Sequence, residues 1–243
     1  MGRMSPEELH RQIQRSLLGA VDPAHREGAY RFFNSRDRGQ VDLYGVRALE
    51  VKRILSSVWR VWKRWADEDR YGLCELLWRS GKLEEGAVAI YLCRRLCRDY
   101  GRRDFDRLEG WIDSYVANWA HCDGVASWLV TACIANEPPL MDRLTDWTHS
   151  PNRWKRRAAA VSLIQKAKHD RNAQRILEIS DLLLDDADPM LQKGVGWLLK
   201  ETYPHHPRTV TAYLRANRQR PARILLRYAA EKMTAADRAS ALA

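Results

Sequence analysis

Apolar side chains recur every three or four residues along almost the whole chain, and this helical spacing is the feature that most limits the possible folds. No segment alternates apolar and polar residues for long enough to predict a strand. The sequence therefore predicts an all-α protein whose helices of about 10–18 residues are joined by short loops. One apolar stripe at this spacing consists of Val51, Ile54, Leu55, Val58, Trp59 and Trp62.

Three dipeptides place a helix-capping residue directly before proline, which is typical of a helix start. They are Ser5-Pro6, Asp22-Pro23 and Ser150-Pro151. At the first of them Glu8 follows Ser5 by three positions, and this spacing predicts a capping box, in which each residue bonds the backbone of the other.

Four similar helix starts recur at nearly constant spacing. Each begins with a large apolar residue and runs into small ones, at Leu83, Trp119, Trp154 and Leu191. Two helices per ~35–40 residues are typical of HEAT-like repeats. The spacing predicts a HEAT-like α-solenoid of about six helical pairs, with a basic concave face lined by the four helices. The alternative is an irregular all-α bundle with chance spacing.

The 243 residues fit one large domain or two small ones. No long linker or low-complexity tract interrupts the sequence, and the polar loop at residues 34–40 is too short to separate two domains. We therefore predict a single domain over residues 1–243.

The balance of charge is basic, with 41 Lys and Arg against 31 Asp and Glu and a net charge of +10. This suggests a polyanionic partner such as nucleic acid, although a merely basic soluble protein is equally compatible. No segment approaches the ~20 apolar residues of a membrane span. The N-terminus lacks the apolar core of a signal peptide. The five cysteines form no CxxC pair, so we expect neither a disulfide framework nor a metal site, in a reducing cytoplasm.

The motifs of the common enzyme classes are absent: there is no GxxxxGK[ST], GxGxxG, HExxH or GxSxG. Tryptophan is abundant instead, with ten in the chain. Trp119, Trp154 and Trp197 fall in the four repeated helices, so the shared face of these helices is predicted to carry them.

Trp119 and Asp123 are four residues apart, which puts an indole and a carboxylate on one helix face. The next repeated helix carries Arg156 and Arg157, and the one after it carries Trp197. Because packed helices lie ~8–10 Å apart, these groups can converge on one spot. The structural alternative is that Asp123 interacts with a helix dipole and the tryptophans belong to the core.

Four segments carry a further pattern, and they resemble motifs of the AlkD-like family of HEAT-repeat DNA alkylation-repair glycosylases. The resemblance runs from roughly residue 25 to residue 232. The segments are Tyr44-Gly45-Val46-Arg47, Trp119-Ala120-His121-Cys122-Asp123, Asn152-Arg153-Trp154-Lys155-Arg156-Arg157-Ala158-Ala159 and Gln192-Lys193-Gly194-Val195-Gly196-Trp197-Leu198-Leu199-Lys200-Glu201.

The resemblance implies a role for each matching residue. Asp123 is the catalytic carboxylate, Trp119 and Trp197 frame the damaged nucleotide, and Arg157 holds the DNA backbone beside it. Tyr30 is the counterpart of an N-terminal tyrosine near the lesion. As groups that face DNA, Arg157 and Trp197 are expected to be exposed in the free protein. If Trp197 is instead core, its truncation should cost ~3–5 kcal/mol of stability.

The implied activity is a monofunctional DNA glycosylase that excises N3- or N7-alkylated, cationic purines from duplex DNA, without base flipping. Such a base leaves as a neutral molecule. A carboxylate can stabilise the oxocarbenium-like sugar and orient the attacking water, and aromatic faces favour the cationic base. No metal and no organic cofactor is expected.

The expected partner is double-stranded DNA with alkylated bases, bound by a monomer in a bacterial-type cytoplasm, at the nucleoid. The alternatives are a non-catalytic HEAT-repeat protein that binds damaged or branched DNA, and a protein-interaction scaffold. For each basic residue the alternative to a phosphate contact is a solvated helix face. The predicted DNA contacts are Tyr30, Arg153, Lys155, Arg156, Lys193, Arg218 and Arg220, with Arg223 and Arg227 in the same basic run.

Overall fold

The computed structural model describes residues 4–33, 41–168 and 172–242. Over these ranges the chain is helical, and the β-type pairings described are two isolated bridges, Val21 with Val46 and Asp42 with Lys82. The all-α prediction is therefore confirmed. The predicted loop at residues 34–40 lies outside the described ranges.

The chain divides into two compact units. Unit 1 consists of residues 1–97 and 114–121, and unit 2 consists of residues 98–113 and 122–243. The chain thus passes from unit 1 to unit 2, returns, and crosses again inside α7 (Trp119–Gly124). The single-domain organisation stays a prediction.

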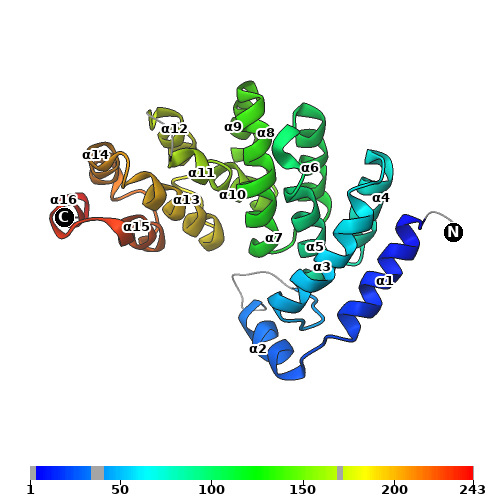
Figure 1. Ribbon diagram of the computed structural model, residues 1–243. Helices are drawn as coiled ribbons and strands as arrows, with labels where there is room; N and C mark the ends of the chain where they lie inside the picture. The colour runs from blue at the N-terminus through cyan, green and yellow to red at the C-terminus, as the bar shows by residue number, and fades with distance from the viewer. Residues whose placement is uncertain (1–3, 34–40, 169–171, 243) are drawn as a thin grey trace. The chain divides into compact units, whose positions relative to one another are not determined.

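In unit 1, α1 packs against α3 and α4, and both α3 and α4 pack against α5 (Figure 1). The apolar stripe predicted for residues 51–62 faces this core, because Val51, Leu55, Val58 and Trp62 are buried. The helices of unit 1 are α1 (Pro6–Leu18), α2 (Pro23–Phe33), α3 (Ala48–Trp62), α4 (Asp67–Arg79) and α5 (Leu83–Arg94).

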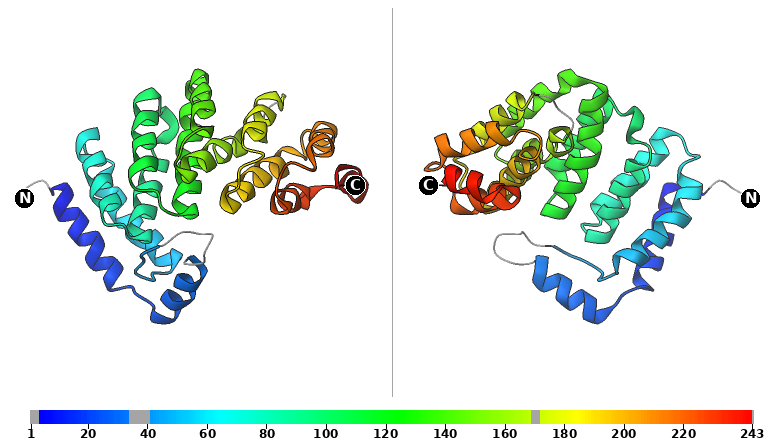
Figure 2. Two further views of the ribbon diagram at one scale, coloured as in Figure 1. Left: turned by 180° about the vertical axis from the view of Figure 1, so that it is seen from behind. Right: turned by 60° about the vertical axis from the view of Figure 1, so that its left-hand side comes forward.

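In unit 2, α10 packs on the π-helical turn η2, α13 packs on α10, and α15 packs on α13 (Figure 1 and Figure 2). Two further helices also pack on α10: α9, which precedes it in the sequence, and α12, which follows it. The elements are α6 (Arg102–Ser114), η2 (Val125–Val130), α8 (Thr131–Asn136), η3 (Pro138–Met141), α9 (Asp142–Thr148), α10 (Arg153–Val161), α11 (Ile164–Ala167), α12 (Gln174–Leu182), α13 (Pro189–Thr202), α14 (Pro207–Asn217), α15 (Arg223–Ala229), η4 (Ala230–Lys232) and α16 (Ala235–Leu242), with η1 (Cys97–Asp99) at the unit boundary.

The predicted helix starts are confirmed at two of the three cap–proline dipeptides. The Ser5 hydroxyl accepts a hydrogen bond from the Glu8 N–H at 3.2 Å, and the Glu8 carboxylate accepts one from the Ser5 N–H at 2.8 Å. At α2, the Asp22 carboxylate accepts a hydrogen bond from the His25 N–H at 3.0 Å.

The prediction that Ser150-Pro151 starts a helix is wrong. α10 begins at Arg153, and the Asn152 side chain caps it by accepting a hydrogen bond from the Trp154 N–H at 2.9 Å. The Asn152 amide also donates to the Ile112 carbonyl of α6 at 3.1 Å. One amide thus satisfies the helix end and ties it to a neighbouring helix, which a serine hydroxyl is too short to do.

Two of the four repeated helix starts coincide with the structure, because α5 begins at Leu83 and α7 begins at Trp119. Trp154 and Leu191 lie one and two residues inside α10 and α13. The start of α13 is a cap–proline pair that the sequence analysis missed. The Asp188 carboxylate accepts hydrogen bonds from the Met190 and Leu191 N–H groups, and Pro189 opens the helix. The HEAT-like repeat and its concave basic face stay predictions.

Candidate functional site

Asp123 and Arg157 form a two-pronged ion pair in unit 2. The Arg157 Nε donates to Asp123 Oδ1 at 2.8 Å, and its Nη2 donates to Oδ2 at 2.9 Å. The Asp123 side chain keeps 15% of its surface exposed, against 6% for Arg157. Two parallel hydrogen bonds fix the carboxylate in one plane, so a largely buried anion is presented in a defined orientation with one side open to solvent.

Arg157 is buried, so the expectation that it is exposed in the free protein is wrong. Its remaining terminal nitrogen, Nη1, donates to the Met190 carbonyl at the start of α13. Burial alone would lower the pKa of the guanidinium, but the charge of Asp123 outweighs it and holds that pKa above its ordinary value. Since all three nitrogens donate inside the protein, the geometry favours a residue that positions Asp123 over one that grips the DNA backbone.

The glycines of the predicted motif on α13 explain how the neighbouring helices approach so closely. A Cβ on Gly194 would lie 3.1 Å from Arg157 Nη1, and a Cβ on Gly196 would lie 2.7 Å from Tyr228 Cβ and 2.8 Å from the Leu225 carbonyl. The first glycine therefore makes room for the Arg157 side chain, and the second makes room for α15.

Trp197 lies on the same side of α13 as Met190 and Gly194, because these positions are spaced by four and three residues. That side is the one on which Arg157 lies. The indole is partly exposed, unlike the buried tryptophans of the core. Its predicted role in framing the nucleotide stays a prediction.

Trp154 agrees with the structural alternative, in which the tryptophans belong to the core. Its side chain is 6% exposed and belongs to the core. The Arg153 guanidinium covers its ring at 4.9 Å from the ring centre. The Trp154 carbonyl accepts a hydrogen bond from the buried Cys122 thiol at 3.2 Å. Trp154 therefore joins α10 to α7.

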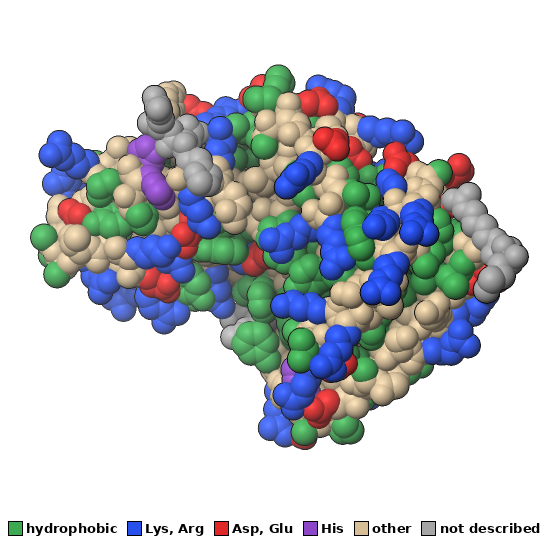
Figure 3. Space-filling view, viewed as in Figure 1, with side chains coloured by type: hydrophobic (Ala, Val, Ile, Leu, Met, Phe, Trp, Pro, Cys, Tyr) green, Lys and Arg blue, Asp and Glu red, His purple; other side chains and the backbone are tan. Residues whose placement is uncertain are grey.

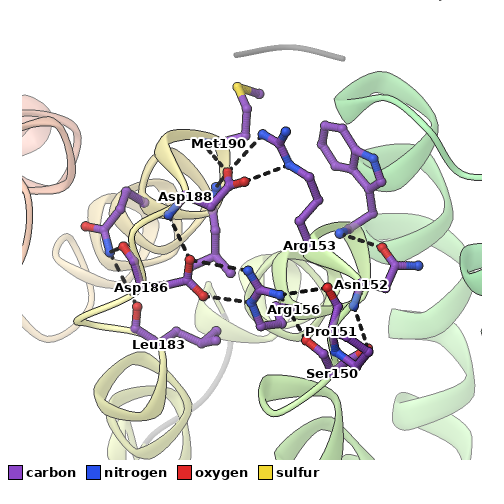
Figure 4. A network of polar contacts seen from close by, with 12 residues as sticks. Ser150, Pro151, Asn152, Arg153, Arg156, Leu183, Asp186, Asp188 and Met190 are labelled. Atoms are coloured by element: carbon purple, nitrogen blue, oxygen red, sulfur yellow. Dashed lines mark hydrogen bonds and ion pairs between the residues drawn. The ribbon is translucent and has the colours of Figure 1, made fainter. Parts of the chain in front are cut away.

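Arg153 and Arg156 are tied to acids at the start of α13 (Figure 4). The Arg153 guanidinium pairs with Asp188 at 2.7 Å, and the Arg156 guanidinium pairs with Asp186 at 2.7 Å. Arg156 also donates to the carbonyls of Ser150 and Pro151. These contacts brace the loop before α10 against the loop before α13, and phosphates would have to compete with them.

Two further predicted DNA contacts, Lys155 and Arg220, already pair with acids of the protein. The Lys155 ammonium lies 2.8 Å from Glu109 and 2.7 Å from Asp113. Burial would lower its pKa, but hydrogen bonds to the two carboxylates outweigh that and raise it. The exposed Arg220 pairs with Asp181 and Asp185, each at 2.7 Å.

The remaining predicted contacts are more accessible. Tyr30 is 53% exposed on α2. Arg218 is exposed, and its guanidinium donates to the Arg215 carbonyl at 3.0 Å. Lys193 is partly exposed on the first turns of α13, with its ammonium 3.8 Å from the Met190 sulfur.

Sequence reasoning missed a basic face on α3 in unit 1. Figure 3 shows Lys and Arg side chains gathered over this helix on the face toward the viewer. Lys52, Arg60, Lys63 and Arg64 form this face, and within the described parts of the chain none of them pairs with a carboxylate. The signal was available as cations at positions 52, 60, 63 and 64, which lie between the apolar positions of the stripe and just after it. The α3 face consists of the exposed Lys52 and Arg60 on α3 and of Lys63 and Arg64, which directly follow its last residue.

Trp119 is held within unit 1 by aromatic contacts. Its indole stacks on Phe33 with ring centres 5.4 Å apart and planes 16° apart. Phe32 meets it edge-on at 6.0 Å. The indole is partly exposed, and both phenylalanines come from the last turn of α2.

The Tyr44-Gly45-Val46-Arg47 segment is a structural element of unit 1. The Glu84 carboxylate accepts hydrogen bonds from the N–H groups of Tyr44, Gly45 and Val46 at 2.7–3.0 Å. Gly45 has a φ of +88°, and a Cβ there would collide with Arg26. Only glycine suits both constraints, so this segment anchors the chain between α2 and α3 and carries no reacting group.

A buried histidine anchors the first turn of α7. The His121 Nε2 donates to the Leu83 carbonyl at 2.9 Å, and its Nδ1 accepts from the Asn118 amide at 3.1 Å. Gly86 provides the space, because a Cβ there would lie 2.5 Å from the imidazole. Burial lowers the pKa of His121 to about 4, against the hydrogen bond to Leu83 and the charge of Glu84, which raise it. The imidazole is therefore neutral at pH 7.

His121 should make the stability depend on pH. His121 takes up a proton near pH 6.5 in the unfolded chain and near pH 4 in the folded protein. Its contribution to the free energy of unfolding is therefore fully present above pH 6.5 and is lost as the pH drops toward 4. We expect a loss of about 2 kcal/mol between pH 7 and pH 5. Urea unfolding should show this loss in the wild type and a smaller one in His121→Gln. The exposed His205→Gln is the control, and equal losses in all three proteins would contradict the assignment.

The described residues contain neither a membrane-spanning helix nor a cluster of metal ligands. None of the described helices is long and apolar enough to cross a membrane. In the same ranges, no three His, Cys, Asp or Glu side chains gather closely enough to hold a metal ion.

The chain resembles a known protein family and solved structures. Residues 13–233 match the family model described as DNA alkylation repair enzyme. Among solved structures, a predicted DNA alkylation repair enzyme from Enterococcus faecalis superposes with a TM-score of 0.77 at 14% identity, covering 88% of this chain and 97% of that chain. At this identity the likeness shows the shared fold alone. No curated protein matches the sequence.

Proposed function

The chain belongs to the DNA alkylation repair enzyme family, and we propose that it acts there as a monofunctional DNA glycosylase. The proposed substrates are N3- and N7-alkylated purines in duplex DNA, whose bases are cationic. Membership of the family places the protein in the repair of alkylated DNA and implies that it binds DNA. The glycosylase chemistry is our proposal.

The observation that carries the proposal is the oriented carboxylate of Asp123, which is largely buried but keeps 15% of its side-chain surface exposed. Arg157 holds both oxygens at 2.8 and 2.9 Å and is itself sealed into the interior. A charged group that is fixed before the substrate arrives stabilises a transition state better than one that must reorient. Asp123 has this preorganisation, and part of its surface remains open to solvent.

In the proposed reaction, the N-glycosidic bond breaks and its electrons leave with the alkylated purine, which departs as a neutral base. The sugar becomes oxocarbenium-like, and the Asp123 carboxylate stabilises its positive charge. A water molecule, oriented or deprotonated by Asp123, then adds to the sugar carbon and leaves an abasic site. No metal or organic cofactor takes part in this scheme.

Two tryptophans are proposed to select the cationic base. Trp197 is partly exposed on the side of α13 that meets Arg157, and Trp119 is partly exposed in unit 1. An aromatic face attracts a cation by ~0.5–2 kcal/mol, so either indole would favour the alkylated base over a normal one. We propose that capture works through the duplex backbone, with the damaged base left largely stacked.

Direct dealkylation by a cysteine is a second way to repair alkylated DNA, and Cys122 stands beside Asp123 in the sequence. Its thiol is buried and donates to the Trp154 carbonyl at 3.2 Å. Burial and the nearby Asp123 carboxylate raise its pKa, which disfavours the thiolate that a methyl acceptor needs. This favours base release over methyl transfer.

A pair of substrates separates the two reactions. Duplexes that carry N7-methylguanine should release the free base, whereas duplexes that carry the neutral O6-methylguanine should stay intact. Loss of the methyl group with the base retained, and a protein that gains the mass of a methyl group, would show dealkylation instead. Tight binding without either product would favour the non-catalytic DNA-binding protein, and no DNA binding would favour the scaffold.

We propose that the α3 face contacts phosphates and that the protein works on duplex DNA as a cytoplasmic, single-domain monomer. Each phosphate contact should contribute about −0.9 to the slope of log K against log salt. Lys52→Ala or Lys63→Ala should therefore make the slope shallower by about 0.9.

Lys155→Ala is the matched control for this prediction, because its ammonium already lies between Glu109 and Asp113. It should leave the slope nearly unchanged. Fluorescence anisotropy of a labelled undamaged duplex at several salt concentrations measures the effect. A larger change for Lys155→Ala than for the α3 variants would show that the wrong surface has been assigned.

A further inference from the structure

Phe33 covers one ring face of Trp119 in the free protein. The two rings are stacked, with centres 5.4 Å apart and planes 16° apart. A nucleotide therefore cannot lie against this face of Trp119 while Phe33 occupies it.

The helix that carries Phe33 is anchored at its start. The Asp22 N–H donates to the Gly45 carbonyl at 3.1 Å, and Arg47 pairs with Asp22 at 2.7 Å. Arg26, in the first turn of α2, lies directly against Gly45. The Glu84 carboxylate holds the backbone of that glycine in turn.

The remainder of α2 has little burial. None of the residues from Pro23 to Phe33 is buried. In its second half, Tyr30 is 53% exposed and Phe32 is 49% exposed. Little apolar surface of this half is removed from water. The hydrophobic free energy that opposes displacement of the last turn is therefore small.

Trp119 also carries an unpaired polar group. Its indole Nε1–H is buried, and no group in the described ranges accepts a hydrogen bond from it. A buried donor without an acceptor is unfavourable. Within the described ranges this donor is therefore unsatisfied, and a DNA oxygen that reached Nε1 could accept its hydrogen bond.

We propose that Phe33 is a stand-in for the alkylated nucleotide: it occupies the ring face of Trp119 in the free protein and is displaced when the lesion binds. The inference rests on the proposed function, since it assigns Trp119 to the nucleotide. Phe33 then acts on lesion affinity and not on bond cleavage, because it has left Trp119 before the reaction begins.

Phe33→Ala should bind the lesion more tightly, because no stacked pair has to be broken. Stacked aromatic pairs correspond to about a 2- to 13-fold change in an equilibrium constant. The probe is a duplex with a 2′-fluoro analogue of N7-methyl-deoxyguanosine, whose electron-withdrawing fluorine slows cleavage. We expect the Kd for this duplex to fall by about 2- to 13-fold and the Kd for the undamaged duplex to stay constant.

Kinetics on the cleavable duplex provide the second readout. In Phe33→Ala, KM should fall with the same factor, and the single-turnover rate at saturation should match the wild type. A residue that merely supports the fold would not lower KM while leaving the single-turnover rate unchanged. Phe33→Leu keeps an apolar side chain but loses the stacking, so it should lie between the wild type and Phe33→Ala.

Phe32→Ala is the matched control, because Phe32 meets Trp119 by its edge at 6.0 Å and leaves the ring face covered. Its Kd should change by less than the Phe33→Ala value. Equal or weaker lesion binding by both Phe33 variants would overturn the inference, as would a Tm loss that marks Phe33 as part of the core. If the wild type binds the fluorinated duplex but releases no base from the cleavable one, the glycosylase proposal fails while the binding comparison still decides the role of Phe33.

Discussion

Replacing Asp123 with asparagine should lower the single-turnover rate of base release by about 10²–10³-fold, the usual effect of deleting one electrostatic stabiliser. Asparagine keeps the shape of the side chain and can still accept one hydrogen bond from Arg157. It carries no charge, and its NH₂ group faces an Arg157 nitrogen that is itself a donor. DNA binding should persist, because the variant removes no cation.

Some stability should be lost with Asp123→Asn, since the buried guanidinium of Arg157 loses its counter-charge. A double variant separates this effect from catalysis. Asp123→Leu with Arg157→Met replaces both charges by apolar side chains, which is often neutral or stabilising for a buried pair. The double variant should therefore melt above Arg157→Met and still release no base. Near-normal release by folded Asp123→Asn would remove Asp123 from the catalytic role.

Replacing Arg157 alone with methionine should produce the largest loss of stability. It leaves the Asp123 carboxylate, which is 15% exposed, without its partner, and the Met190 carbonyl without its donor. Breaking a buried pair in this way costs about 3–5 kcal/mol, which corresponds to a fall in Tm on the order of 10 °C for a chain of this size. Thermal melts followed by circular dichroism measure it.

Arg175→Met is the matched control, because it removes a partly exposed arginine that pairs with the exposed Asp142. Exposed pairs contribute about 0–1 kcal/mol, so its Tm should change by only a few degrees. Equal melting temperatures for Arg157→Met and Arg175→Met would mean that Arg157 is not buried in solution. Equal melting temperatures are what a group that faces DNA would give.

Local chemistry explains why much of the helix pattern could be predicted. The capping box at Ser5 and Glu8 and the starts at Leu83 and Trp119 depend on residues within one or two turns. The pairing of Asp123 with Arg157 was within reach for a similar reason, since a repeat spacing brings side chains in successive helices together. The start of α10 could not be predicted in this way. Asn152 caps the helix in place of Ser150, and its amide also bonds the Ile112 carbonyl, which lies 40 residues away in the sequence.

Long-range pairing limited the prediction of the basic surface. Arg156 lies 30 residues from Asp186, and Lys155 lies 42 residues from Asp113. The number of charges in the sequence does not show which acids lie opposite these cations. The cations were therefore predicted to face solvent or DNA. Burial has the same limit: Arg157 is sealed by the Met190 carbonyl and the close approach of Gly194, and neither contact is visible from α10 alone.

The central claim is that the wild-type protein breaks the N-glycosidic bond of a cationic purine and leaves the DNA strand whole. The most direct test incubates excess protein with a duplex that holds one N7-methylguanine, and follows free base by chromatography and strand length by denaturing gel. We predict release of N7-methylguanine well above the spontaneous rate, with a strand that stays uncut until alkali is added. Release no faster than in buffer, or strand cleavage without alkali, would contradict the claim.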